Sequence, residues 1–102
     1  MKRMYIALAA TALASAPAFA SKDLAGKNAC LACHAVDRKL VGPSFQDVAK
    51  KYNDQKDAQA TLAGSIKNGG AGKWGPVPMP AQAALSESDA KTLAAWVLAG
   101  AR

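Results

Sequence analysis

Two cysteines and a histidine stand within one short run of the sequence, Cys30-Leu31-Ala32-Cys33-His34. On a helix, residues at i, i+3 and i+4 project from one face, so both thiols and the imidazole are predicted to point the same way. The C-x-x-C-H spacing is typical of covalent attachment of a c-type haem. Each thiol would bond a vinyl group of one flat macrocycle, and His34 would lie under its iron.

Other uses of the two cysteines explain less of the sequence. A redox disulfide at this spacing expects a βαβ context, and no segment reads as a convincing strand. A closed zinc site needs four ligands, whereas the chain after residue 20 holds two cysteines and one histidine. A haem-free binding module with a Cys30–Cys33 disulfide would leave the histidine and the proline-rich loop around Met79 unexplained. Haem is therefore the preferred interpretation.

Met79 is the only methionine after residue 20, and it lies between Pro78 and Pro80. A methionine usually fills a core, but a core methionine normally lies on a periodic helix face. Flanking prolines restrict the backbone and could hold the thioether in place, so Met79 is predicted to be the second axial ligand. Histidine–methionine ligation is typical of electron transfer, because the thioether raises the reduction potential.

The same ligand set argues against catalysis. A five-coordinate enzyme or gas sensor would need an open iron, which a bound Met79 would block. The single histidine is already used, and the seven carboxylates scatter over helix starts and loops. The sequence therefore predicts an electron carrier and no enzyme.

The first twenty residues have the features of a secretory signal peptide. Lys2 and Arg3 precede an apolar, alanine-rich run over residues 4–16, and Ala18-Phe19-Ala20 fits a small-residue cleavage site before Ser21. The run would span roughly 20 Å as a helix, short of the ~30 Å hydrocarbon core. The prediction is a cleaved leader over 1–20, one domain over 21–102, and no stable membrane insertion after cleavage.

Composition narrows the class of partner. The chain has 102 residues, 51% of them hydrophobic and 20% charged, which is an ordinary globular balance. Thirteen basic and seven acidic residues give a net charge of +6, and loss of Lys2 and Arg3 leaves 11 minus 7, or +4. Basic charge can indicate nucleic acid binding. The lysines do not form one run and an exported chain has little access to nucleic acid, so no nucleic acid partner is predicted.

Hydrophobic periodicity and capping residues predict four helices. S-x-x-D starts at Ser44 and Ser86 mark two of them. Proline- and glycine-containing loops over 36–43 and 69–85 separate the helices. The fold class is all-α, with about four short helices around something they cannot fill alone. The predicted helices cover residues 22–33, 44–52, 57–68 and 86–99.

Several motifs together resemble a known family. They are the segments 30–35 and 41–44, then Ile66-Lys67-Asn68-Gly69, residues 74–80 and residues 95–98. On these motifs, the chain resembles the small bacterial class I cytochromes c of the cytochrome c-551 type, also called cytochrome c8. The resemblance covers nearly all of residues 21–102. The resemblance implies a class I cytochrome c fold around one covalent haem, and a monomeric electron carrier of the periplasm. Implied partners are redox proteins such as a nitrite reductase, a terminal oxidase or a membrane quinol-oxidising complex.

The resemblance also implies roles for individual residues. Pro43 would accept a hydrogen bond from His34 Nδ1, Trp74 would donate to a haem propionate, and Gln82 would lie near the Met79 sulfur. From the residues alone, Trp74 could also be a core or partner-surface side chain, and Gln82 a solvent-facing loop residue. The side chains expected to line the haem pocket are Phe45, Leu62, Ile66, Leu93 and Val97.

The sequence departs from the family at a few positions. Ser65 stands where relatives carry a propionate-binding arginine, with Lys67 or Lys73 as candidate replacements. Ala25 replaces a larger residue, and the segment 81–85 is one residue longer than in some relatives. The lysines expected near the haem edge, which could steer the protein onto an acidic partner, are Lys27, Lys39, Lys67 and Lys73.

Overall fold

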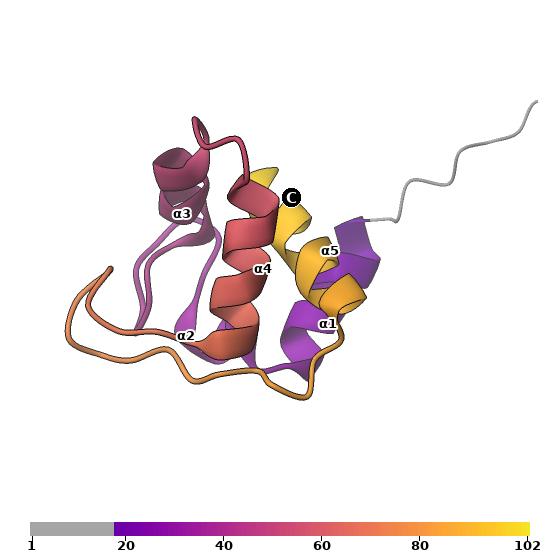
Figure 1. Ribbon diagram of the computed structural model, residues 1–102, viewed down its shortest axis with the longest axis horizontal. Coiled ribbons are helices and arrows are strands. Elements are labelled where there is room, and N and C mark those ends of the chain that lie inside the picture. The colour runs from indigo at the N-terminus through magenta and orange to yellow at the C-terminus, as the bar shows by residue number, and fades with distance from the viewer. Residues whose placement is uncertain (1–17) are drawn as a thin grey trace, which may run out of the picture.

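The computed structural model describes residues 18–102, which form five helices and two isolated β-bridges. The expected all-α class is confirmed. Most of the predicted leader lies outside the described residues, and the predicted cleavage point falls within the first helix, so cleavage stays a prediction. The helices are α1 (Ala18–Lys27), α2 (Cys30–Cys33), α3 (Phe45–Tyr52), α4 (Ala58–Asn68) and α5 (Glu87–Leu98) (Figure 1).

The predicted helix over 22–33 is wrong, because the chain breaks into α1 and α2. Asn28 Nδ2 donates to the Leu24 carbonyl at 2.8 Å, and Ala29 adopts a left-handed conformation with φ 60°. Asparagine favours helix ends because its side chain competes for the backbone, and a left-handed residue stops helical propagation. The break frees α2 to turn in its own direction.

Side-chain caps start α3 and α5 at the predicted places. Ser44 Oγ accepts from the Asp47 N–H at 3.1 Å, and Ser86 Oγ accepts from the Asp89 N–H at 3.0 Å. Each cap satisfies a backbone donor that has no partner within its own helix.

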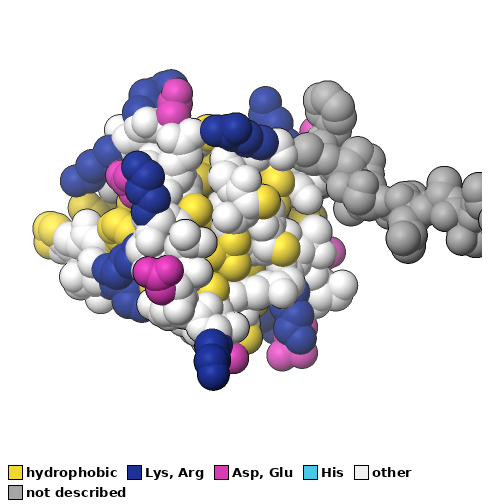
Figure 2. All heavy atoms as spheres, turned by 90° about the horizontal axis from the view of Figure 1, so that it is seen from above, with side chains coloured by type: hydrophobic (Ala, Val, Ile, Leu, Met, Phe, Trp, Pro, Cys, Tyr) yellow, Lys and Arg dark blue, Asp and Glu magenta, His cyan; other side chains and the backbone are white. Residues whose placement is uncertain are grey.

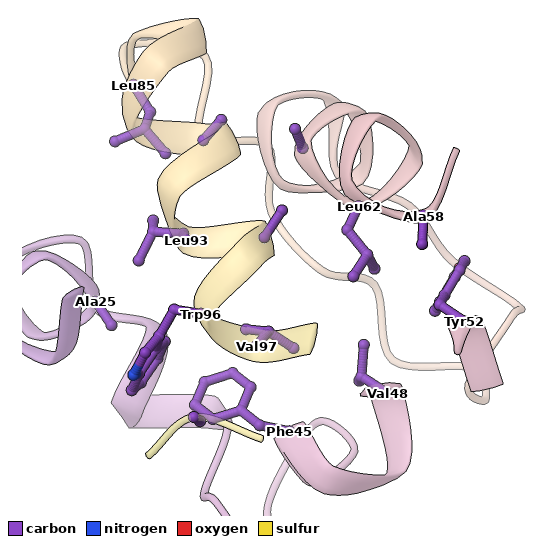
Figure 3. Close-up of a cluster of buried hydrophobic side chains, with 14 residues drawn as sticks. Ala25, Phe45, Val48, Tyr52, Ala58, Leu62, Leu85, Leu93, Trp96 and Val97 are labelled. Carbon is purple, nitrogen blue, oxygen red and sulfur yellow. The ribbon is translucent and has the colours of Figure 1, made fainter. Parts of the chain in front are cut away.

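The helix α5 lies at the centre of the described fold and packs against α1, α3 and α4. Its buried residues include Leu93, Trp96 and Val97. Val97, Leu62 of α4 and Val48 of α3 point toward the same interior space (Figure 3). No large side chain of the described residues reaches less than 2% exposure. The core is thus built from side chains that surround a space.

A long loop joins α4 to α5 and runs back past the lower end of α4 (Figure 1). Gly69 ends α4 with φ 69°, and a Cβ there would lie 2.5 Å from the Met79 carbonyl oxygen. Gly70 and Met79 then exchange backbone hydrogen bonds of 3.1 and 2.7 Å. Only glycine permits both this backbone conformation and this close approach. Met79 is therefore fixed against the end of α4.

None of the helices described is both long enough and apolar enough to span a membrane.

We expect Ser86→Ala to lower the free energy of unfolding by about 1 kcal/mol, because it removes the cap of the central helix. Denaturant unfolding of the purified protein, followed by circular dichroism, measures the change. Ser88→Ala is the matched control, since Ser88 is exposed, is the second residue of the same helix and does not cap it. Equal losses in the two variants would contradict the assigned role of Ser86.

Candidate functional site

A cavity of about 330 Å³ lies between the helices and the loop that joins α4 to α5. Its walls are mainly apolar, and residues from all five helices contribute to them. A second hollow of about 910 Å³ lies along α5 and the C-terminal residues, and no residue predicted from the sequence to bind a cofactor lines it. The chemistry predicted from the sequence therefore lies at the smaller, apolar cavity.

Cys30 and Cys33 both line this cavity as half-buried, free cysteines. They lie at the two ends of α2, which the break at Ala29 separates from α1. Burial raises the pKa of the Cys30 thiol, and the neighbouring Cys33 adds to this rise. The Cys30 thiol is therefore protonated at neutral pH in this structure.

His34 lies just after α2, with an extended backbone at φ −121° and ψ 142°. His34 thus lies one residue beyond the helix, but its side chain lines the same cavity as Cys30 and Cys33. Its backbone N–H still donates to the Cys30 carbonyl at 2.9 Å, so the helix ends on this residue. Contacts from the following loop set the direction of the imidazole.

Three neighbours orient the imidazole. His34 Nδ1 lies 2.7 Å from the Pro43 carbonyl oxygen, and its ring stacks on Phe45 with centroids 5.2 Å apart. A carbonyl can only accept, so Nδ1 carries the proton and Nε2 keeps a free lone pair. A Cβ at Gly42 would lie 2.6 Å from His34 Cε1. Gly42 belongs to the segment 41–44 that resembles the family, but sequence reasoning assigned it no role. Its role follows from this contact across the loop.

Met79 lines the same cavity, although it lies 45 residues beyond His34 in the chain. Its backbone pairs with Gly70, and its residue is half-buried. The structure thus brings together the two thiols, the imidazole and the thioether that the sequence singled out.

The predicted wall residues also line the cavity, with one exception. Gln82 is not among the lining residues, and its backbone N–H donates to the Ile66 carbonyl at 3.0 Å. Sequence reasoning did not assign Val48, Tyr52 or Trp96 to the wall. Val48 and Tyr52 are four residues apart and so lie on one side of α3. Only the packing of the helices shows that this side faces the cavity. The predicted residues that do line the cavity are Pro43, Phe45, Leu62, Ile66, Trp74, Leu93 and Val97.

Polar groups gather at one part of the cavity lining. Lys73 Nζ donates to Tyr52 Oη at 2.7 Å, and Lys51 Nζ lies 4.4 Å from the centroid of the Trp74 ring. Ser65 lines the cavity too, but its hydroxyl donates to the Thr61 carbonyl at 3.1 Å.

Of the four lysines expected near the haem edge, two line the cavity. These are Lys39 and Lys73, whereas Lys27 and Lys67 do not contribute to its wall.

The cavity fits a haem on three counts. Apolar walls suit a flat hydrophobic macrocycle, two free thiols suit its covalent attachment, and an imidazole with an exposed lone pair suits its iron.

One buried donor, Trp96 Nε1, has no hydrogen-bond partner among the described residues.

Comparison with known proteins gives the family that the sequence motifs resemble. A family model described as cytochrome c matches residues 20–101. Cytochrome c-551 of Pseudomonas denitrificans is 53% identical over 77 residues, which are 76% of this chain and 93% of that protein.

Two solved structures are similar to the fold. The crystal structure of Nitrosomonas europaea cytochrome c552 matches with a TM-score of 0.75 and 52% identity, over 78% of this chain and 98% of that one. The class 1 cytochrome MtoD of Sideroxydans lithotrophicus ES-1 matches with a TM-score of 0.70 and 29% identity, over 86% and 100%. The chain therefore belongs to the cytochrome c family, as a small class I electron-transfer protein that carries haem c on its C-x-x-C-H motif.

Proposed function

We propose that this protein is a periplasmic one-electron carrier whose haem iron is ligated by His34 and Met79. The observation that carries the proposal is that the imidazole and the thioether line the same cavity as both cysteines. Haem c supplies one-electron chemistry at its iron when it is bound. The role of the chain is to hold that group and to set its environment.

His34 is suited to the first axial position because only its Nε2 is free to ligate. The hydrogen bond from Nδ1 to Pro43 selects this tautomer and makes the imidazole a stronger ligand. Stacking on Phe45 restricts rotation of the ring.

Met79 is suited to the second axial position because its backbone is restrained on both sides. Pro78 and Pro80 flank it in the chain, and the pairing with Gly70 ties it to the end of α4. A thioether at this position raises the reduction potential. Together, His34 and Met79 would hold a bound iron from both sides in either oxidation state, so little reorganisation would accompany electron transfer.

The same arrangement supports a carrier over an enzyme. No group of three or more His, Cys, Asp or Glu residues that could hold a metal occurs among residues 18–102. The chain contains a single histidine, and Pro43 already engages its Nδ1. No second imidazole is therefore available as a general base.

The location and partners follow from the leader and the family. A signal peptide over 1–20, cut before Ser21, would deliver the domain to the periplasm as a monomer. Proposed electron partners are a nitrite reductase, a terminal oxidase or a membrane quinol-oxidising complex. On the face in Figure 2, lysine and arginine side chains lie dispersed around exposed hydrophobic ones, which suits protein docking better than nucleic acid binding.

We expect Met79→Ala to abolish the weak methionine–Fe(III) charge-transfer band of the oxidised protein and to permit CO binding in the reduced state. The reduction potential should fall, within the about 0.8 V over which axial ligands tune haem iron. Visible spectroscopy and voltammetry of protein matured with haem measure both effects. Val77→Ala is the control, because Val77 is an exposed residue of the same loop that lines the cavity but has no atom able to ligate iron. A band that survives in Met79→Ala would remove Met79 from the ligand set.

We expect Gly42→Ala to destabilise the haem-loaded protein by about 1–3 kcal/mol, because the added methyl group would collide with the His34 ring. Denaturant unfolding followed at the haem absorbance measures the loss. Gly64→Ala is the matched control, since a Cβ there meets nothing within 4 Å and a helical Gly→Ala change should stabilise by about 0.5–1 kcal/mol. Equal stability changes of the same sign would contradict the role assigned to Gly42.

We expect the doubly substituted chain Cys30→Ala/Cys33→Ala to be poorly folded, because the haem fills the space that the helices surround. Far-UV circular dichroism should show most of the helical signal lost relative to the haem-loaded protein. Wild-type chain produced without haem is the control that separates the effect of the alanines from that of the missing group. A near-native spectrum would show that the helices pack without it.

A further inference from the structure

Two pairs of neighbouring residues, distant from each other in the chain, form a polar cluster at the cavity. This cluster, here called the donor rim, consists of Lys51, Tyr52, Lys73 and Trp74. Lys73 Nζ lies 2.7 Å from Tyr52 Oη and 5.2 Å from the centroid of its ring. Lys51 Nζ donates to the Lys73 carbonyl at 3.4 Å. Tyr52, Lys73 and Trp74 line the cavity.

The hydrogen bond between Lys73 and Tyr52 leaves one proton without an acceptor. An ammonium group can only donate, so Tyr52 Oη accepts from Lys73 and its own O–H points elsewhere. Tyr52 is 2% exposed, which leaves little access to bulk water. Among the described residues, no hydrogen bond takes up this proton. A buried donor without an acceptor is destabilising, because its contact with water is lost and not replaced.

The donor rim also lacks a compensating negative charge. Within residues 18–102 the one ion pair joins Arg38 to Asp37, both on the surface. The ammonium groups of Lys51 and Lys73 thus both belong to the donor rim, and in the part of the chain that is described no carboxylate pairs with either. A group that paired with the cations would be negatively charged, and a group that took the phenol proton would be a hydrogen-bond acceptor. A carboxylate meets both requirements.

We propose that Lys73 and Tyr52 together bind one propionate carboxylate of the haem. The propionates are the acidic substituents of a haem, and a macrocycle lying between His34 and Met79 shares its cavity with Tyr52 and Lys73. The ammonium supplies charge and the phenol supplies a directed O–H. This inference rests on the proposed function, since it needs haem in the cavity.

Other groups at the cavity are less suited to this role. Ser65 has its hydroxyl proton engaged by Thr61, and Lys67 does not line the cavity. Lys39 does line it, but its backbone pairs with His34, in the loop that orients the imidazole. Lys73 is therefore the cation whose ammonium is held beside a buried, donor-capable phenol.

The test uses haem-loaded protein whose propionate carboxyl carbons carry ¹³C. Nuclear magnetic resonance of the reduced form follows each carboxyl signal from pH 4 to 9. In Lys73→Met, the titration midpoint of one carboxyl should rise by about one pH unit or more, because a nearby cation lowers a carboxyl pKa by about 1–3 units. In Tyr52→Phe the same carboxyl should shift in the same direction by less, since a neutral donor is lost and the buried ring is kept.

The controls separate this role from a general effect on folding. Lys73→Arg should keep the wild-type midpoint, and Lys91→Met should move neither carboxyl, because this exposed lysine of α5 lies outside the cavity wall. Unchanged midpoints in both Lys73→Met and Tyr52→Phe would overturn the proposal, as would an equal shift in Lys91→Met. A wild-type spectrum without the methionine band would overturn the axial assignment while leaving the titration interpretable, so the two failures are distinguishable.

Discussion

The helices of this protein surround a space instead of filling one, and the rest of the structure depends on that constraint. Leu62, Leu93 and Val97 are buried core residues and walls of the cavity at the same time. An apolar group that occupied the centre would therefore add hydrophobic stabilisation to this core. Cofactor attachment and folding are therefore coupled, because the same side chains serve both.

Two segments far apart in the chain must meet across that space, and backbone contacts bring them there. The loop after α2 folds back so that the Pro43 carbonyl reaches His34, while Gly42 leaves room for the ring. On the other segment, Gly69 permits the close approach of the Met79 backbone to the end of α4. Rigid backbone on both sides suits a carrier, since a fixed ligand geometry keeps the reorganisation on electron transfer small.

The cavity has an apolar interior and a polar rim, and the two parts suit different parts of a haem. The apolar interior would exclude water from a bound haem iron and bind the macrocycle by hydrophobic contact. The rim gathers Lys51 and Lys73 beside Tyr52, which suits the acidic edge of a haem. A cation held close to the haem also favours the reduced state, because reduction removes one unit of positive charge. Side chains at the rim can thus influence both orientation and potential.

The sequence by itself determined the haem-attachment motif and the starts of α3 and α5, because C-x-x-C-H and the two serine caps each act over a few residues. It also predicted the helices α3, α4 and α5 within a residue or so. The break at Ala29 is also local, through the hydrogen bond from Asn28 to Leu24, but hydrophobic periodicity did not predict it. Only the tertiary structure decided that Pro43 and Phe45 orient the His34 ring and that Lys73 reaches Tyr52. These features depend on contacts between residues distant in the chain, and local periodicity carries no information about such contacts.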